Sequence, residues 1–327
     1  MNFNNLNKNN KAHVLITGGC GFIGSHIVKN LIMLGIEKIT VIDSLKYGSI
    51  NNITDILDKI TFVQSTLGHE ISSQLETIFK NVDYVIHLAA EKHNQSKDSP
   101  HILFDSNING TYNVLKLAAQ NHVKKIVFSS SLYVYGRKSL PPYVESEALF
   151  PTTPYGISKL CGEHFCRFFS AQYGLKFTIL RYLFAYGPNQ FAQMGYKSVI
   201  VKNFERILRN ENPIVFGDGQ QALDYIYVED VARMTIQCLF DDQTNNVLNV
   251  GSGKPITVNE LTDKMINISG KPLVKQFGLK DETHNSIRVA NTDRLTQYGF
   301  NPQVELEEGL KRTYSWMQKK QQTQHTS

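Results

Sequence analysis

The sequence predicts an α/β fold built on a doubly wound parallel sheet, with a smaller α/β lobe in the C-terminal part. Short apolar runs alternate with segments of helical periodicity through the first half, and the first run stops at a glycine-rich turn. The chain has 327 residues, of which 41% are hydrophobic and 19% charged, enough for one large domain and a smaller lobe. Strands that alternate with helices imply right-handed crossovers and a parallel sheet.

Six short apolar segments have the composition and length of strands. They span residues 13–17, 38–43, 59–64, 84–88, 125–130 and 177–181. A further strand-like segment follows at residues 223–228, after the turn Gly217-Asp218-Gly219.

Helical periodicity fills the intervals between these strands. Residues 24–34 place Ile27, Val28 and Leu31 on one face, and Gly35 follows as a stop signal. Further helices are expected at residues 107–120, 155–173 and 198–209.

The polar ends and a change of pattern after Gly187-Pro188 divide the chain. The expected parts are a disordered tail at residues 1–11, a large dinucleotide-binding domain at 12–188 to which 223–250 return, a substrate-binding lobe at 189–222 and 251–318, and a frayed tail at 319–327.

The first strand runs directly into a glycine-rich turn that opens a helix. Gly18, Gly21 and Gly24 are spaced three apart. Such a turn needs backbone angles that glycine adopts freely, room for a pyrophosphate, and close packing of helix on strand. The helix N-terminus, with Phe22 and Ile23, then presents N–H groups and a positive dipole end to phosphates. Three glycines alone are weak evidence for such a site. Together with the strand before them and the helix after them, they predict a Rossmann-type dinucleotide site.

Asp43 ends the second strand, about 20 residues after the glycines, where such sites carry an acid on the adenosine ribose. A carboxylate accepts from both ribose hydroxyls and repels a phosphate, so the sequence predicts NAD rather than NADP. Ser44 follows as a further candidate contact. Lys46 is the only cation nearby that could receive a 2′-phosphate. The alternative role for Asp43 is a helix or turn cap.

Tyr155 and Lys159 stand four residues apart, which places them on one face of a helix. A neighbouring ammonium and a positive nicotinamide ring favour the tyrosine phenolate, which can then take a proton from an alcohol. Ser131, just after the fifth strand, lies at the sheet edge where ligands bind and is predicted to hydrogen-bond the same alcohol. This spacing is common by chance, but beside a dinucleotide loop it predicts an oxidoreductive site.

Composition argues against several other classes of partner. The formal charge of +5 is spread along the chain, so a solvated surface is favoured over a nucleic-acid interface. No apolar run has the length of a membrane span, and the N-terminus lacks the apolar core of a signal peptide. The four cysteines form no CxxC pair and no zinc-type cluster, which predicts no metal and a reducing, cytoplasmic location.

Longer motifs add a family resemblance. The stretches TGGCGFIG, VIDSLKYGSINN, HLAA, NINGTYNVL, SSSLYVYG, PTTPYGISKLCGE, LRYLFAYGP and GDGQQALDYIYVEDV occur in order over residues 14–300. The chain resembles the extended short-chain dehydrogenases/reductases of the NAD-dependent nucleotide-sugar epimerase/dehydratase family, especially UDP-glucose 4-epimerase-like members.

The resemblance implies a catalytic triad of Ser131, Tyr155 and Lys159, and a homodimer formed through the helices that flank the tyrosine segment. It implies that Asn107 positions a helix near the site. The resemblance and the glycine-rich loop together place twelve residues at the cofactor. They are Gly18, Gly21, Phe22, Ile23, Gly24, Asp43, Ser44, Ala89, Ala90, Tyr155, Lys159 and Tyr182.

The expected substrate contacts come from several segments. They are Lys92, His93, Ser96, Tyr133, Phe184, Lys197, Lys202 and Arg288. The sequence departs from the family at Phe184, where UDP-sugar members usually have Asn, at Leu223, in place of an Arg, and at residues 281–284, in place of a later Arg-bearing stretch. UDP-glucose and UDP-galactose are therefore expected to be poor substrates.

The resemblance favours a nucleotide-sugar epimerase that acts at carbon 4 through a keto intermediate. A dehydrogenase that releases the keto-sugar is the alternative within enzymes, and a non-catalytic NAD sensor is the alternative outside them. A 4,6-dehydratase is disfavoured, because Leu132 and Tyr133 stand where dehydratases carry an acid and a base. Glu91 and His93 are the candidates that could replace them.

Overall fold

The structure, a computed structural model, describes residues 9–68, 70–93, 99–136, 141–190, 197–280 and 286–325. The chain forms two compact units. Unit 1 comprises Met1–Ser139, Glu145–Tyr182 and Val231–Asn249, and unit 2 comprises Leu140–Val144, Leu183–Asp230 and Val250–Ser327.

Unit 1 is built on a seven-stranded sheet of order β10-β6-β5-β4-β1-β2-β3. Its strands are β1 (His13–Thr17), β2 (Lys38–Asp43), β3 (Thr61–Gln64), β4 (Tyr84–His87), β5 (Lys125–Ser131), β6 (Phe177–Tyr182) and β10 (Asn246–Val250). Every neighbouring pair from β6 to β3 runs parallel. The strand order reverses between β1 and β4, which is the topological switch point where doubly wound sheets bind ligands. The predicted fold class is confirmed.

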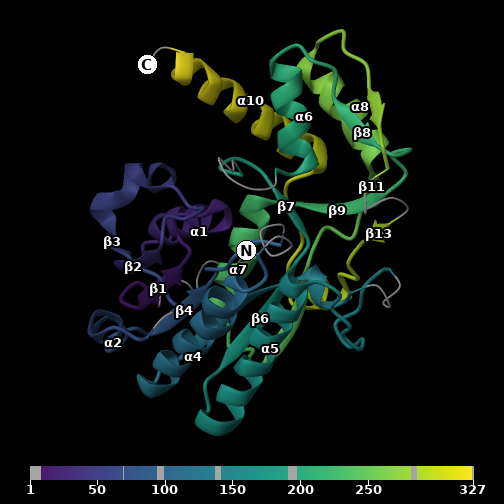
Figure 1. The fold of residues 1–327 in the computed structure, drawn as a ribbon. Helices are drawn as coiled ribbons and strands as arrows, with labels where there is room; N and C mark the ends of the chain where they lie inside the picture. Colours follow the sequence, from purple (N-terminus) through teal and green to yellow (C-terminus); the bar gives the residue numbers. More distant parts are fainter. Residues whose placement is uncertain are drawn as a thin grey trace. The chain divides into compact units, whose positions relative to one another are not determined.

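Helices cover this sheet (Figure 1). They are α1 (Phe22–Met33), α2 (Ser73–Phe79), the π-helix η4 (Phe104–Asn109), α4 (Gly110–Gln120), α5 (Pro154–Tyr173) and most of α7 (Val228–Phe240), with 3₁₀ turns η2 (Ile50–Asn52), η3 (Thr54–Lys59) and η5 (Leu132–Val134). Helix α5 begins cleanly because the Thr153 hydroxyl accepts from the Gly156 N–H, with Pro154 at the first position. Gly174, at φ +71°, ends it.

One core cluster joins this sheet to α2, α4 and α5. Leu15, Val85 and Ile126 come from three strands, and Phe79 and Val114 come from two of the helices; all five are fully buried. Each such side chain stabilises the fold by about 1.5–3 kcal/mol relative to exposure. The core therefore fixes the carboxyl ends of the strands, where the candidate site lies.

Unit 2 has its own small sheets. Strands β7 (Phe184–Tyr186), β11 (Pro255–Thr257) and β13 (Ile287–Arg288) all pair with β9 (Ala222–Tyr227), and β8 (Ile214–Phe216) pairs with β12 (Gln276–Gly278). Its helices are α6 (Val199–Leu208), α8 (Val258–Ser269), α9 (Asp293–Gln297) and α10 (Leu306–His325). Phe204, Leu261 and Leu310 of α6, α8 and α10 lie in one core cluster. A separate core supports the expectation of a smaller α/β lobe.

The boundaries of the units differ from the predicted ones. The large domain was expected at residues 12–188 with 223–250 returning to it, whereas unit 1 stops at Tyr182 and resumes at Val231. The reason is strand pairing, because β7 and β9 pair with each other and not with β6. Apolar runs predict strands, but they do not say which sheet a strand joins.

Two helical predictions also change. The helix expected at residues 107–120 begins as the π-helix Phe104–Asn109 before it becomes α4. The frayed tail expected at 319–327 is helical through His325, because α10 continues over Lys and Gln residues, which favour helix. Lys320 also lies over the Trp316 ring, with 5.2 Å between its Nζ and the ring centroid. Residues 1–8 of the predicted N-terminal tail, and 326–327, lie outside the described residues.

Among the residues that the structure describes, no helix combines the length and apolar character of a membrane span.

Candidate active site

The glycine loop after β1 is shaped by close backbone approaches. Gly18 has φ +75°, and a Cβ there would lie 2.8 Å from the Ala89 nitrogen. A Cβ on Gly24 would lie 2.2 Å from the Gly18 oxygen. Both positions therefore exclude larger residues, and they bring the loop after β4, with Ala89 and Ala90, against the loop after β1.

Helix α1 begins directly at this loop. Its N-cap is Gly21, and no side chain caps the first turn, to which Phe22 and Ile23 belong. The first N–H groups of a helix have no intrahelical partner, and together with the dipole they attract a phosphate. This uncapped first turn therefore leaves room and N–H donors for a phosphate group.

Asp43, at the end of β2, is almost fully buried beside this loop. Its Oδ2 accepts from the Cys20 N–H at 2.9 Å, and its Oδ1 accepts from the Leu45 N–H at 2.8 Å. Burial raises the pKa of the Asp43 carboxyl, while these two N–H groups lower it. Each carboxylate oxygen keeps further acceptor capacity, which fits the two ribose hydroxyls of NAD.

Gly48 also shapes the surroundings of the Asp43 carboxylate, which the sequence reasoning missed. A Cβ there would lie 3.0 Å from the Asp43 Oδ2, a tight contact that favours glycine where the chain turns back over this carboxylate. Ser44 is exposed, and its Oγ accepts from the Lys46 N–H at 3.3 Å. The only sequence signal was a glycine a few residues after the acid.

The three predicted catalytic residues come together at the carboxyl end of β5. Ser131 is the last residue of β5, and its hydroxyl is hydrogen-bonded to the Tyr155 hydroxyl. Tyr155 and Lys159 lie one turn apart on α5, and the Lys159 Nζ is 5.8 Å from the Tyr155 ring centroid. The Lys159 ammonium donates to the Ser129 carbonyl at 2.8 Å, which ties α5 to β5.

Burial dominates the electrostatics of this group. It raises the pKa of the Tyr155 hydroxyl; the Ser131 hydrogen bond lowers it, and Tyr133 raises it further. Burial also lowers the pKa of Lys159 to about 7. Without a further positive charge, the surrounding groups therefore keep Tyr155 protonated at neutral pH.

Asn107 holds the segments around this group together. It lies in the π-helix η4, and its Oδ1 accepts from the Glu91 N–H at 2.7 Å. Its amide donates to the Glu91 carbonyl at 3.3 Å and to the Ser158 hydroxyl at 3.0 Å. Asn107 thus links the loop after β4 to the residue that precedes Lys159.

Tyr182 ends β6 in register with Ser131. Its hydroxyl is 2.8 Å from the Thr235 hydroxyl, which donates to the Val231 carbonyl, so Tyr182 acts as the donor to Thr235. This hydroxyl is therefore committed within unit 1, and only the ring and backbone of Tyr182 remain for a cofactor.

Three aromatic side chains gather beside the catalytic group. The His93 ring stacks on Tyr133 with centroids 4.1 Å apart, and both rings stand edge-on to Tyr155 at 6.0 and 5.9 Å. His93 and Tyr133 thus lie beside Tyr155. Lys92 is exposed, with its Nζ 5.0 Å from the Tyr47 ring centroid, and Ser96 lies outside the described residues.

The other predicted substrate residues lie in unit 2. Phe184 packs 5.8 Å from the Tyr225 ring, and the Lys197 Nζ pairs with Glu205 at 2.7 Å. Lys202 is exposed on α6, and Arg288 is half-buried on β13. The altered segment 281–284 lies outside the described residues.

A buried ion pair behind the catalytic group escaped the sequence reasoning. Arg181 of β6 donates to both oxygens of Glu163 on α5, at 2.9 and 2.8 Å, and both residues are at most 1% exposed. The Ser130 hydroxyl donates to the same Glu163 carboxylate at 2.6 Å. Glu163 thus links α5, which carries Tyr155, to the residue before Ser131.

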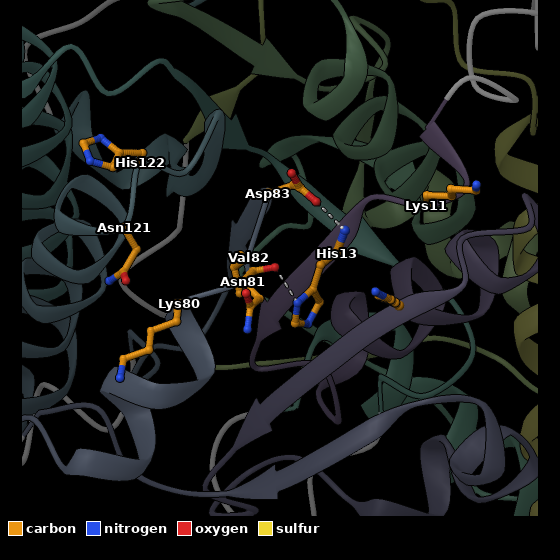
Figure 2. Close-up of a pocket in the computed structure, with 9 residues that line it drawn as sticks. Lys11, His13, Lys80, Asn81, Val82, Asp83, Asn121 and His122 are labelled. Carbon is orange, nitrogen blue, oxygen red and sulfur yellow. Dashed lines mark hydrogen bonds between the residues drawn. The ribbon is translucent and has the colours of Figure 1, made fainter.

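A pocket of about 760 Å³ lies at the other end of the unit 1 strands, where β1 and β2 begin (Figure 2). His13 and Lys38, the first residues of β1 and β2, line it together with Lys11 and Lys80. In Figure 2 the His13 ring contacts the Asn81 carbonyl, at 2.8 Å. The catalytic and glycine-loop residues lie at the carboxyl ends of the strands, so this pocket is separate from the candidate active site.

His87, at the end of β4, is a structural histidine rather than a site residue. Its Nδ1 is 2.6 Å from the Thr17 hydroxyl, and its Nε2 is 3.0 Å from the Thr111 hydroxyl. Burial lowers the pKa of this imidazole to about 3, and Lys159 lowers it as well. The folded protein therefore holds His87 neutral.

This shift predicts acid sensitivity. Between pH 6.5 and 3 the unfolded chain binds a proton on His87 that the folded chain does not. His87 therefore leaves the free energy of unfolding unchanged above pH 6.5 and lowers it progressively as the pH drops below that value. From pH 7 to pH 5 the free energy of unfolding should drop about 2 kcal/mol more in the wild type than in His87→Gln. Urea denaturation at both pH values measures the difference, and equal drops would contradict the assignment.

Comparison with known proteins places these features in a family. The sequence profile of the NAD dependent epimerase/dehydratase family matches residues 14–251. A putative UDP-glucose 4-epimerase of Methanocaldococcus jannaschii is 35% identical over 95% of this chain and 100% of its own length.

Solved structures agree with this placement. A UDP-N-acetylglucosamine 4-epimerase from Methanobrevibacter ruminantium M1, in complex with UDP-N-acetylmuramic acid, is 33% identical, with TM-score 0.89 over 95% of this chain and 99% of that one. A UDP-glucose 4-epimerase of Thermus thermophilus in complex with NAD is 30% identical, with TM-score 0.84 over 93% of this chain and 98% of that one. The chain belongs to the NAD-dependent epimerase/dehydratase family.

Proposed function

We propose that this protein is an NAD-dependent nucleotide-sugar epimerase that inverts carbon 4 of the sugar through a keto intermediate. The observation that carries the proposal is the Ser131–Tyr155 hydrogen bond, with Lys159 one turn further along α5, at the carboxyl edge of the sheet. The epimerase relatives support it.

Each catalytic residue has a definite task in this proposal. The Tyr155 oxygen takes the proton of the carbon-4 hydroxyl, and the Ser131 hydroxyl hydrogen-bonds the same sugar oxygen. Lys159, fixed by the Ser129 carbonyl, contributes positive charge and a donor for the nicotinamide ribose. After the keto-sugar has rotated to present its opposite face, Tyr155 returns the proton to the carbon-4 oxygen. The proton is thus restored, and the sugar leaves with inverted configuration.

NAD, when bound, supplies the hydride acceptor and returns the hydride to carbon 4. The residues proposed to hold its phosphates are Gly18, Gly21, Phe22, Ile23 and Gly24, and Asp43 is proposed to accept from the adenosine ribose. Ser44, Ala89, Ala90 and Tyr182 complete the proposed cofactor contacts. The uncapped start of α1 and the buried Asp43 carboxylate support this arrangement.

The sugar is proposed to contact the group formed by His93 and Tyr133, since both rings lie within 6.0 Å of the Tyr155 ring. Lys92 and Ser96 are further proposed contacts from the same loop. Phe184, Lys197, Lys202 and Arg288 are proposed contacts from unit 2. The names of the relatives favour a UDP-sugar as the class of substrate.

Incubation with a panel of nucleotide hexoses tests the reaction type. The expected product has the mass of its substrate, and NADH does not accumulate. UDP-glucose and UDP-galactose are expected to react slowly, because Phe184 and Leu223 replace polar and cationic residues that are usual in the family. Mass spectrometry and absorbance at the NADH band measure these outcomes.

Other products would contradict the proposal in distinct ways. A keto-sugar formed with stoichiometric NADH would indicate a dehydrogenase. A product lighter by one water would indicate a dehydratase, with Glu91 or His93 as the missing base. Absence of any reaction with tightly retained NAD would indicate a non-catalytic sensor.

The proposal includes a cytoplasmic homodimer that serves carbohydrate biosynthesis. Support for a second copy comes from α4 and α5, which run side by side (Figure 1). Their exposed aromatic side chains are Tyr112, Phe168 and Tyr173. The four cysteines, all free thiols, support a reducing compartment.

A further inference from the structure

Glu91 pairs with Lys46, the cation nearest to Asp43 along the sequence. Its Oε1 accepts from the Lys46 ammonium at 2.5 Å, and its Oε2 accepts from the Tyr47 hydroxyl at 2.5 Å. The Glu91 side chain is 6% exposed, whereas that of Lys46 is 46% exposed. A buried carboxylate needs such partners, so Lys46 is drawn to Glu91 rather than left to solvent.

The backbone of Glu91 is itself fixed. Asn107 accepts from the Glu91 N–H and donates to its carbonyl, so the carboxylate is held by the loop after β4. Burial, and then Glu91, raise the pKa of the Tyr47 hydroxyl, which therefore remains a donor to Glu91. The Lys46 Nζ also lies 5.3 Å from the Tyr47 ring centroid. The position of Lys46 is thus set by several contacts at once.

Lys46 belongs to the short segment that wraps around Asp43. Leu45 donates its N–H to the Asp43 Oδ1. Gly48 passes so close to the same carboxylate that a Cβ added to it would lie 3.0 Å from the Asp43 Oδ2. Lys46 stands between these two residues in the sequence, three residues after the carboxylate that is proposed to accept from the ribose hydroxyls of NAD. A 2′-phosphate attached there would seek a cation, and Lys46 is the nearest one along the sequence.

We propose that Glu91 is a cofactor-specificity residue, which holds the Lys46 ammonium away from a 2′-phosphate and so reinforces the preference for NAD. Asp43 repels the extra phosphate, and Glu91 withholds the cation that would compensate for it. The inference rests on dinucleotide binding and not on the sugar chemistry, so it can fail or hold independently of the proposed epimerase activity.

Competition between the two dinucleotides tests this role without an activity assay. The purified holoprotein is equilibrated with equal concentrations of NAD and NADP, unbound nucleotide is removed, and the ratio released on denaturation is measured by chromatography. Glu91→Gln is expected to raise the bound NADP-to-NAD ratio roughly fivefold, the size of a half-exposed charged contact. Adding Lys46→Gln to this variant should return the ratio to the wild-type value.

Two single variants serve as controls. Lys46→Gln alone should leave the ratio unchanged, because the ammonium is already engaged in the wild type. Tyr47→Phe should also leave it unchanged, because it removes the other donor to Glu91 and keeps Lys46 paired. An unchanged ratio in Glu91→Gln would overturn the proposal. A fall in the ratio in Lys46→Gln alone would overturn it too, even if Glu91→Gln did not fold, because Lys46 would then already serve the phosphate.

Discussion

Replacing Tyr155 with phenylalanine is expected to lower the rate of epimerisation about 10²- to 10⁴-fold, the range for loss of a general acid–base group. The variant removes the hydroxyl that is bonded to Ser131 and keeps the ring that packs edge-on to His93 and Tyr133. Bound NAD should be retained, because the proposed phosphate contacts lie on the loop after β1. Turnover of an accepted nucleotide sugar and the NAD released on denaturation are the two measurements.

A matched control lies on the same helix. Tyr173 at the end of α5 is exposed, so Tyr173→Phe removes a hydroxyl far along the helix from Tyr155. It should turn over substrate at the wild-type rate. The assigned base would be wrong if Tyr155→Phe kept more than about a tenth of that rate, since general acid–base groups contribute far more than tenfold.

Replacing Glu163 with alanine is expected to lower the free energy of unfolding by about 3–5 kcal/mol, because it leaves the buried Arg181 guanidinium without its carboxylate. Arg181 is 1% exposed, and both of its bonds to Glu163 are charge-assisted. Ser130 loses its acceptor in the same substitution. Urea denaturation followed by circular dichroism measures the loss.

Two further variants separate the buried charge from a general effect of substitution. The double variant Glu163→Met with Arg181→Met removes both charges and should be less destabilised than Glu163→Ala. Asp55→Asn breaks an exposed ion pair with Lys29 in the same unit, and should change the free energy by less than about 1 kcal/mol. Equal losses in Glu163→Ala and Asp55→Asn would contradict the assigned role.

The strands of unit 1 were the most predictable part of the fold. In a parallel sheet that is covered on both faces a strand is a continuous apolar run, and β1 and β2 have the predicted bounds. The π-helix at Phe104–Asn109 was not predictable in the same way. It is a short insertion of i→i+5 bonding at the start of α4, and six residues are too few for its side-chain period to be recognised in the sequence.

The residues of the candidate site also fall into two groups, those with a local sequence signal and those whose partners are distant in the sequence. Gly18, Asp43 and the Tyr155–Lys159 pair carry local signals, because a turn, a strand end and one helical turn fix them. The contacts of Glu91 with Lys46 and Tyr47 join segments 44 or more residues apart, and sequence spacing says nothing about such a pairing. The same holds for Arg181 with Glu163, which stand on different elements of unit 1.

The sequence was also informative about what surrounds the proposed base. Leu132 and Tyr133 were noted as departures from a dehydratase site, and the structure adds that Tyr133 stacks on His93 beside Tyr155. That contact depends on how the loop after β4 meets η5, which only the folded chain reveals.

We propose that hydride leaves carbon 4 and returns to the same carbon, while Tyr155 removes and returns the proton of the carbon-4 oxygen. A nucleotide sugar that the enzyme accepts, labelled with deuterium at carbon 4, tests this most directly by NMR and mass spectrometry. We expect an epimer that keeps its deuterium at carbon 4, with unchanged mass and no net NADH. Loss of the deuterium to free reduced cofactor with a keto-sugar product, or a product lighter by one water, would contradict it.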